Sequence, residues 1–162
     1  MRAFRGLCAA LEHPEADARA AAATGLAFIS DPRAVSALFP HAEDSAEEPG
    51  VRAQCIEGIG CQLMGTDRRR SEFRRAARRV VEWLQDPSPD VRFWSAYAAA
   101  VIGLRAARPH LEVIARNDHV LIGRNWGLCL EARWALAAID GREEPEIGHG
   151  LLCADCATRS PS

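Results

Sequence analysis

The chain has 162 residues, of which 48% are hydrophobic but only 6% aromatic, and alanine alone fills 30 positions. This length and composition suit one ordinary domain or a short array of repeats, and they exclude collagen-like and intrinsically disordered chains. All 20 basic residues are arginine and the formal net charge is -2, so nucleic acid or an anionic membrane would need a local basic patch to bind.

The first residues contain two arginines but lack the apolar stretch of about 7 to 15 residues that an export signal needs. The most apolar run, residues 98–104, is far shorter than the roughly 18 residues of a membrane span. We therefore expect a soluble, cytoplasmic protein that does not bind membranes. In a reducing compartment, the six cysteines are expected to be thiols rather than a disulfide framework.

Three segments of the chain share one pattern. Each begins with an acidic or proline-rich turn, continues with an arginine, and then runs into alanine and aliphatic residues. The arginines are Arg19, Arg52 and Arg92, and a fourth copy has Cys129 at the equivalent position. The predicted helices cover residues 20–30, 53–63, 93–103 and 128–140. Recurrence at intervals of about 33 and 40 residues is typical of repeats built from helix pairs.

A second helical segment follows each of the first three helices, over residues 32–42, 68–85 and 105–116. One helix of a pair buries only part of its apolar face, so the neighbouring pair must cover the rest. Alternating strand patterns are absent. We therefore predict an all-α fold, a short right-handed α-solenoid of about four helix pairs over residues 1–141. Residues 142–162 are expected to form a partly ordered tail.

Local signals mark several helix ends. Asp31 and Asp86 directly precede proline, which predicts an acidic N-cap with proline at the first helical position. Gly103 and Gly141 lie at the expected C-terminal ends of helices, where a residue in the left-handed conformation ends the helix. The Gly-Ile-Gly run at residues 58–60 lies inside a predicted helix and indicates close packing of a neighbouring helix.

Two stretches carry the pattern of a known family. They are Asp-Pro-Ser-Pro-Asp-Val-Arg-Phe-Trp-Ser-Ala-Tyr-Ala-Ala-Ala-Val-Ile-Gly at residues 86–103, and Ala-Arg at 18–19 with Gly-Leu-Ala-Phe-Ile-Ser-Asp-Pro-Arg-Ala-Val at 25–35. The pattern resembles HEAT-like repeats of the phycobilin-lyase type, over roughly residues 12–140. An insertion around residues 65–70 and the missing arginine of the fourth copy depart from it. Because such repeats occur in lyase subunits, scaffolds and adaptors alike, the resemblance implies an architecture rather than a reaction.

The resemblance also implies that the arginine-bearing helices line a concave surface. The positions expected to face this groove are Ala20, Ala21, Thr24, Phe28, Ala53, Gln54, Glu57, Cys61, Phe93, Trp94, Tyr97, Val101, Leu130, Glu131, Trp134 and Ala138. Half of the chain's ten aromatic residues are among them. A groove with this aromatic density is a candidate binding surface for a peptide, a helix or a planar ligand. The alternative is that the aromatic residues fill the core between repeats or are covered by the tail.

The segment at residues 68–79 contains seven arginines and one glutamate. As a helix, it would carry Arg70, Arg74, Arg75, Arg78 and Arg79 opposite an apolar face. The guanidinium group of arginine donates paired hydrogen bonds to phosphates and carboxylates, so this segment is the candidate site for binding nucleic acid or an acidic partner. The alternative, which we favour, is a solvated outer face paired with the acidic turn at residues 43–48.

The tail contains His149, Cys153 and Cys156, which resemble half of a zinc site. A fourth ligand is not evident, and a lone Cys-x-x-Cys is a weak signal, so no metal or other cofactor is predicted. The preferred interpretation is that Leu151 and Leu152 cap the last repeat.

No catalytic constellation stands out, because none of the five histidines has an acidic or hydroxyl partner at motif spacing. The sequence therefore favours a non-enzymatic interaction module that docks a partner protein through Phe28, Phe93, Trp94, Tyr97, Trp134 and Glu131. One alternative is a lyase-type auxiliary enzyme or chromophore-binding subunit that holds a planar chromophore on the same rings. Another is nucleic-acid binding through residues 68–79. Excision of alkylated bases, which some HEAT-like proteins perform, is an analogy only.

Overall fold

The computed structural model describes residues 2–123 and 126–142. These residues form eight α-helices, one short 3-10 helix and two short strands. The helices are α1 (Arg2–Leu11), α2 (Ala16–Phe28), α3 (Ala34–Glu43), α4 (Pro49–Leu63), α5 (Ser71–Trp83), α6 (Pro89–Val101), α7 (Arg108–Asn117) and α8 (Leu128–Asp140). The 3-10 helix η1 (Arg105–Ala107) leads into α7, and the strands are β1 (Leu121–Ile122) and β2 (Trp126–Gly127).

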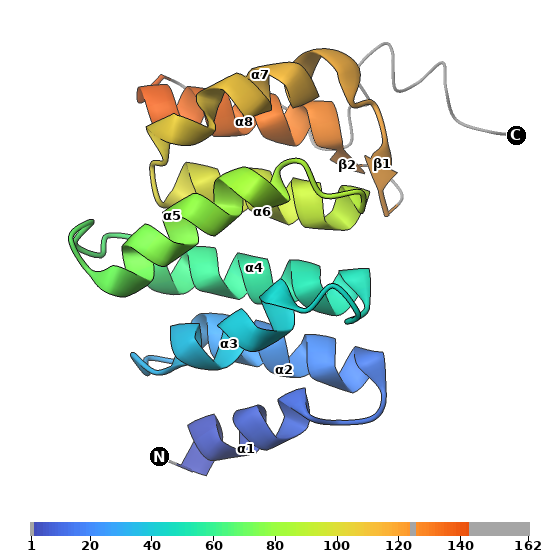
Figure 1. Cartoon of the computed structure of the whole chain (residues 1–162), viewed down its shortest axis with the longest axis vertical. Helices are drawn as coiled ribbons and strands as arrows, with labels where there is room; N and C mark the ends of the chain where they lie inside the picture. Colours follow the sequence, from blue (N-terminus) through green and yellow to red (C-terminus); the bar gives the residue numbers. More distant parts are fainter. Residues whose placement is uncertain (1, 124–125, 143–162) are drawn as a thin grey trace, which may run out of the picture.

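The helices stack in two layers along the long axis of the molecule (Figure 1). The even-numbered helices α2, α4, α6 and α8 pack side by side in one layer, and the odd-numbered helices lie on them. Alanine allows this close packing: Ala23, Ala96 and Ala132 in the even-numbered layer are completely buried. The structure therefore confirms the predicted all-α solenoid of four helix pairs.

The pairing of the helices differs from the sequence prediction. The sequence prediction grouped each arginine-bearing helix with the segment that follows it. In the structure, of the two odd-numbered helices next to it in the chain, each even-numbered helix packs mainly against the one before it, so the pairs are α1–α2, α3–α4, α5–α6 and α7–α8. The acidic turns join the two helices of each of the first three pairs, and residues 29–33, 64–70 and 102–107 join successive pairs. Helix α1, which the sequence grouping left without a role, completes the first pair. The fourth pair is complete without the tail.

The predicted N-caps Asp31 and Asp86 do not cap their helices, because α3 begins at Ala34 and α6 at Pro89. The Asp31 and Asp86 side chains instead accept hydrogen bonds from the backbone N–H groups two residues on, at 3.0 and 2.9 Å, which shapes the turn before each helix. The predicted glycine stops are confirmed, since Gly103 and Gly141 have φ values of 62° and 64°.

Gly60 sets the spacing of α4 and α6. A Cβ atom at this position would lie 2.9 Å from Cα of Ala98 and 3.2 Å from Cγ2 of Val101. Gly60→Ala is therefore expected to push the two helices apart and to lower the free energy of unfolding by about 1–3 kcal/mol. Urea denaturation followed by circular dichroism measures this change.

Gly6→Ala in α1 is the matched control, because a Cβ atom at Gly6 has no atom within 4 Å. Alanine is also the better helix former, so this variant is expected to be as stable as the natural protein or slightly more stable. Equal urea midpoints for Gly60→Ala and the natural protein would contradict the close packing of α4 against α6.

A short antiparallel hairpin between α7 and α8 was not predicted. Leu121 pairs with Gly127 and Ile122 with Trp126. Two-residue strands are too short to show an alternating pattern, so their sequence carries no usable signal. The hairpin brings Trp126, an exposed aromatic residue, to the N-terminal end of α8.

Candidate functional site

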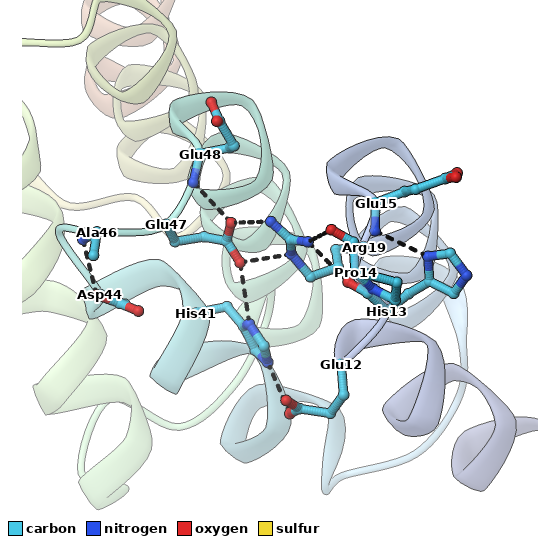
Figure 2. Close-up of polar contacts among 10 residues, drawn as sticks. All are labelled: Glu12, His13, Pro14, Glu15, Arg19, His41, Asp44, Ala46, Glu47 and Glu48. Atoms are coloured by element: carbon cyan, nitrogen blue, oxygen red, sulfur yellow. Dashed lines mark hydrogen bonds and ion pairs between the residues drawn. The ribbon is translucent and has the colours of Figure 1, made fainter.

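The repeated arginines form a ladder of ion pairs from one repeat to the next. In the first rung, Nε and Nη2 of Arg19 donate to the two carboxylate oxygens of Glu47 at 2.9 and 2.6 Å. Nη1 of Arg19 donates to the carbonyl oxygens of His13 and Pro14. His41 lies between Glu47 and Glu12, at 3.6 and 3.4 Å (Figure 2). The first rung therefore joins α2 to the turn before α4.

The next two rungs repeat this arrangement. Nη2 of Arg52 donates to Asp86 at 2.7 Å, and Nε of Arg92 donates to Asp118 at 2.8 Å. Arg92 also donates to two backbone carbonyls of the turn before α6, as Arg19 does for the turn before α2. The buried Cys129 occupies the fourth position, so the ladder stops at α6. We assign these arginines to the cohesion of the solenoid rather than to a binding site.

Five aromatic side chains form a continuous row at the C-terminal end of the solenoid. We call Trp126, Phe93, Trp94, Tyr97 and Trp134 the aromatic row. Phe93 makes edge contacts with Trp126 and Trp94, with ring centroids 6.3 and 5.4 Å apart, and Trp94 makes one with Tyr97 at 5.5 Å. Tyr97 on α6 stacks on Trp134 of α8, at 5.8 Å and an interplanar angle of 11°.

The members of the aromatic row differ in exposure. Trp94, Tyr97 and Trp134 are half-buried, so each presents part of its ring to solvent. Phe93 is only 5% exposed, which corrects the expectation that it faces a groove, because it packs in the core beneath its neighbours. Trp126 is 63% exposed and was missed, since it lies outside the repeat pattern.

Three other expected groove positions are placed differently, and one of them, Glu131, is only 7% exposed. Ala53 is buried, because it packs between the helices rather than facing outward. Phe28 is 73% exposed but lies on α2, which is separated from α6 by α4, and no ring contact joins it to the aromatic row among the described residues. The structure thus brings together the aromatic residues of α6 and α8 and leaves Phe28 apart.

Two carboxyl groups flank the exposed part of the aromatic row. Glu131, one turn before Trp134 on α8, is only 7% exposed, and burial raises its pKa to about 7. Glu57 on α4 is half-buried, and desolvation raises its pKa, while a hydrogen bond with Gln54 opposes this. The pKa of Tyr97 rises to about 12 through desolvation first, then its contact with Cys61, and then the nearby charges of Glu57 and Glu131. Both carboxyl groups are therefore within electrostatic reach of the Tyr97 hydroxyl.

Cys61 links α4 to the same surface. Its Sγ atom lies 3.8 Å from the hydroxyl oxygen of Tyr97, and desolvation raises the pKa of the thiol. A thiol held protonated in this way is a poor nucleophile. Cys61 therefore contacts Tyr97 as a neutral thiol.

The arginine-rich helix α5 presents the predicted two faces. Its apolar residues Phe73, Ala76, Val80 and Trp83 are buried against the solenoid. Arg75 and Arg79 form ion pairs with Glu43, and Arg79 also pairs with Glu82. Arg70 lies 3.8 Å from Glu72. Three of the five predicted arginines are thus paired within the described chain.

The remaining two arginines of this set, Arg74 and Arg78, are exposed, and neither forms an ion pair with a described residue. Of the predicted acidic partners in the 43–48 turn, only Glu43 reaches α5, because Glu47 is already held by Arg19.

The weak metal-ligand candidates His149, Cys153 and Cys156, and the capping residues Leu151 and Leu152, lie outside the described residues. Within residues 2–123 and 126–142, no three His, Cys, Asp or Glu side chains are grouped closely enough to hold a metal ion. No helix in the same ranges has both the length and the apolar character to cross a membrane.

Comparison with known proteins agrees with this architecture. The family model for HEAT repeats matches residues 4–69 and 45–131, which together cover most of the chain. No curated protein matches it significantly. The matched residues contain most of α1, all of α2 to α7, the start of α8 and the three repeated arginines. With its stacked helix pairs and its repeated arginines, the chain belongs to the HEAT repeat family.

Proposed function

We propose that this protein is a non-enzymatic interaction module that binds a partner protein through Trp94, Tyr97 and Trp134. HEAT repeats commonly mediate protein–protein interaction. The observation that supports this surface is the continuity of the aromatic row across α6 and α8, with three half-buried rings in contact. Large aromatic side chains held rigidly at a surface dominate the binding energy of protein interfaces.

The two alternatives have weaker support. Nucleic-acid binding through α5 would rely on Arg74 and Arg78, because Arg75 and Arg79 are already paired with Glu43. A chromophore-binding or lyase-type role would use the flat stacked faces of Tyr97 and Trp134, but the neighbouring Cys61 has a raised pKa and is poorly suited to covalent attachment. Visible colour in the purified protein would favour the chromophore alternative.

The proposed function predicts that the partner still binds at high salt and that its binding depends on the two half-buried tryptophans, Trp94 and Trp134. The immobilised chain is incubated with a lysate of its native cell. Each bound protein is then purified, and its affinity for the natural chain and for each variant is measured. Trp94→Ala and Trp134→Ala are each expected to weaken the affinity at least about 30-fold, the loss typical of an aromatic hot spot. Circular dichroism verifies that both variants keep their helices.

Phe28→Ala is the matched control, because this ring is exposed but lies outside the aromatic row, and it should bind like the natural protein. A second control, Arg74→Gln with Arg78→Gln, removes the unpaired charges of α5. Recovery of nucleic acid alone, with binding that falls steeply with salt and disappears in the arginine variant, would contradict the proposed function.

A further inference from the structure

Glu131 is a buried carboxyl group on a surface of aromatic rings. It is 7% exposed, and within residues 2–123 and 126–142 no ion pair reaches it or Glu57. By contrast, Glu43, Glu47, Asp86 and Asp118 are all paired with arginine. A buried acid without a cationic partner is costly, so its position beside the aromatic row requires an explanation.

The register of the repeats places Glu131 next to Trp94. Tyr97 and Trp134 occupy equivalent positions of α6 and α8, and their stacked rings show that these positions face each other. Trp94 and Glu131 each lie three residues earlier on the same helices, and side chains three apart share one face of a helix. Two indole rings, a phenol ring and a carboxyl group thus form one compact patch.

We propose that this patch binds an arginine side chain of the partner, with the guanidinium group against Trp94, Tyr97 and Trp134 and ion-paired with Glu131. This inference rests on the proposed function and specifies the chemistry of the partner. Glu57 on α4, whose charge also acts on the Tyr97 hydroxyl, adds a second carboxyl group near this patch.

Arginine fits these groups better than the other basic side chain. Its guanidinium group is planar, stacks on aromatic rings and donates paired hydrogen bonds to a carboxylate, whereas the ammonium group of lysine is compact and strongly hydrated. The arginine ladder shows the same chemistry within the chain, where Arg19 donates two hydrogen bonds to Glu47. Cation–ring contacts also occur within the chain, since the guanidinium carbon of Arg75 lies 4.1 Å from the ring centroid of Phe39.

A library of short random peptides displayed on phage tests this inference without a known partner. Peptides selected on the natural protein are sequenced, and the strongest is synthesised with its arginine intact, changed to lysine, or changed to glutamine. We expect arginine to be enriched among the selected peptides. Changing it to glutamine should weaken binding about 10- to 100-fold, and changing it to lysine should weaken binding less.

Protein variants test which carboxyl group binds the arginine of the peptide. Glu131→Gln keeps the shape of the side chain and removes its charge. It should weaken binding of the arginine-containing peptide about 10- to 100-fold and should hardly change binding of the peptide in which that arginine is glutamine. Glu57→Gln should have a smaller effect in the same direction. Glu112→Gln, which changes an exposed carboxyl group on α7, is the control and should bind like the natural protein.

The outcomes separate the two proposals. Peptides that depend on Trp94 and Trp134 but lack arginine, or that bind Glu131→Gln equally well, would overturn the arginine site and leave the proposed function intact. Failure to select any peptide that depends on Trp94 and Trp134 would overturn both. Enrichment of acidic peptides that bind through Arg74 and Arg78 would also overturn both and would favour α5 as the interaction surface.

Discussion

Replacing Arg52 with alanine is expected to lower the free energy of unfolding by about 3–5 kcal/mol, the largest effect we predict for a single substitution. The side chains of Arg52 and its partner Asp86 are each only 10% exposed, and the two are joined by a hydrogen bond of 2.7 Å. Alanine would leave the Asp86 carboxylate in a poorly hydrated position without its cation. Because the pair joins α4 to the turn before α6, its loss should weaken the contact between successive repeats.

Urea denaturation of Arg52→Ala, compared with Arg116→Ala, measures this effect. Arg116 is an exposed arginine whose ion pair with Glu112 has a separation of 3.9 Å, so its removal should cost less than about 1 kcal/mol. A double-mutant cycle with Arg52→Ala, Asp86→Ala and the double variant gives the interaction free energy between the two side chains, separately from the packing that each side chain loses. Similar costs for Arg52→Ala and Arg116→Ala would show that the ladder does not hold the repeats together.

Repetition made the architecture predictable from sequence. The recurring arginine turns and the alanine-rich helices gave the fold class and the position of every even-numbered helix to within a few residues. The pairing was not predictable in the same way, because the sequence does not show against which of its two chain neighbours an arginine-bearing helix packs. The packing of the helices shows it, and the ladder agrees, since each arginine reaches the turn within the next pair.

The surface was predicted less completely than the fold. Repeat register placed Trp94, Tyr97 and Trp134 on one face, because equivalent positions of stacked repeats lie side by side. It also placed Phe93 there, although a one-residue step around a helix turns its ring into the core. Trp126 lies in a hairpin outside the repeat, so no periodic signal could locate it. The burial of Glu131 was not evident from the sequence of α8 alone.

Glu131→Gln is expected to stabilise the protein by up to about 3 kcal/mol at pH 8 and by much less at pH 5. The pKa of Glu131 is raised to about 7 by burial, from an ordinary value of 4.5 that the unfolded chain retains. As the pH rises above 4.5, the unfolded state loses this proton before the folded state does, so the folded state loses stability progressively until about pH 7. Glutamine does not ionise, so the variant escapes this loss.

Urea denaturation of the natural protein and Glu131→Gln at pH 5, 6, 7 and 8 tests this dependence, with Glu112→Gln as the exposed control. The stability difference should grow with pH for Glu131→Gln and stay nearly constant for Glu112→Gln.

A carboxyl group that lowers stability at neutral pH is the kind of feature that function retains, because binding a cation would stabilise its charged form. Since the arginine peptide should bind the charged form, its affinity should increase over the pH range in which Glu131 ionises. A stability difference that does not change with pH would show that Glu131 is not desolvated, and it would remove the energetic basis for an arginine site.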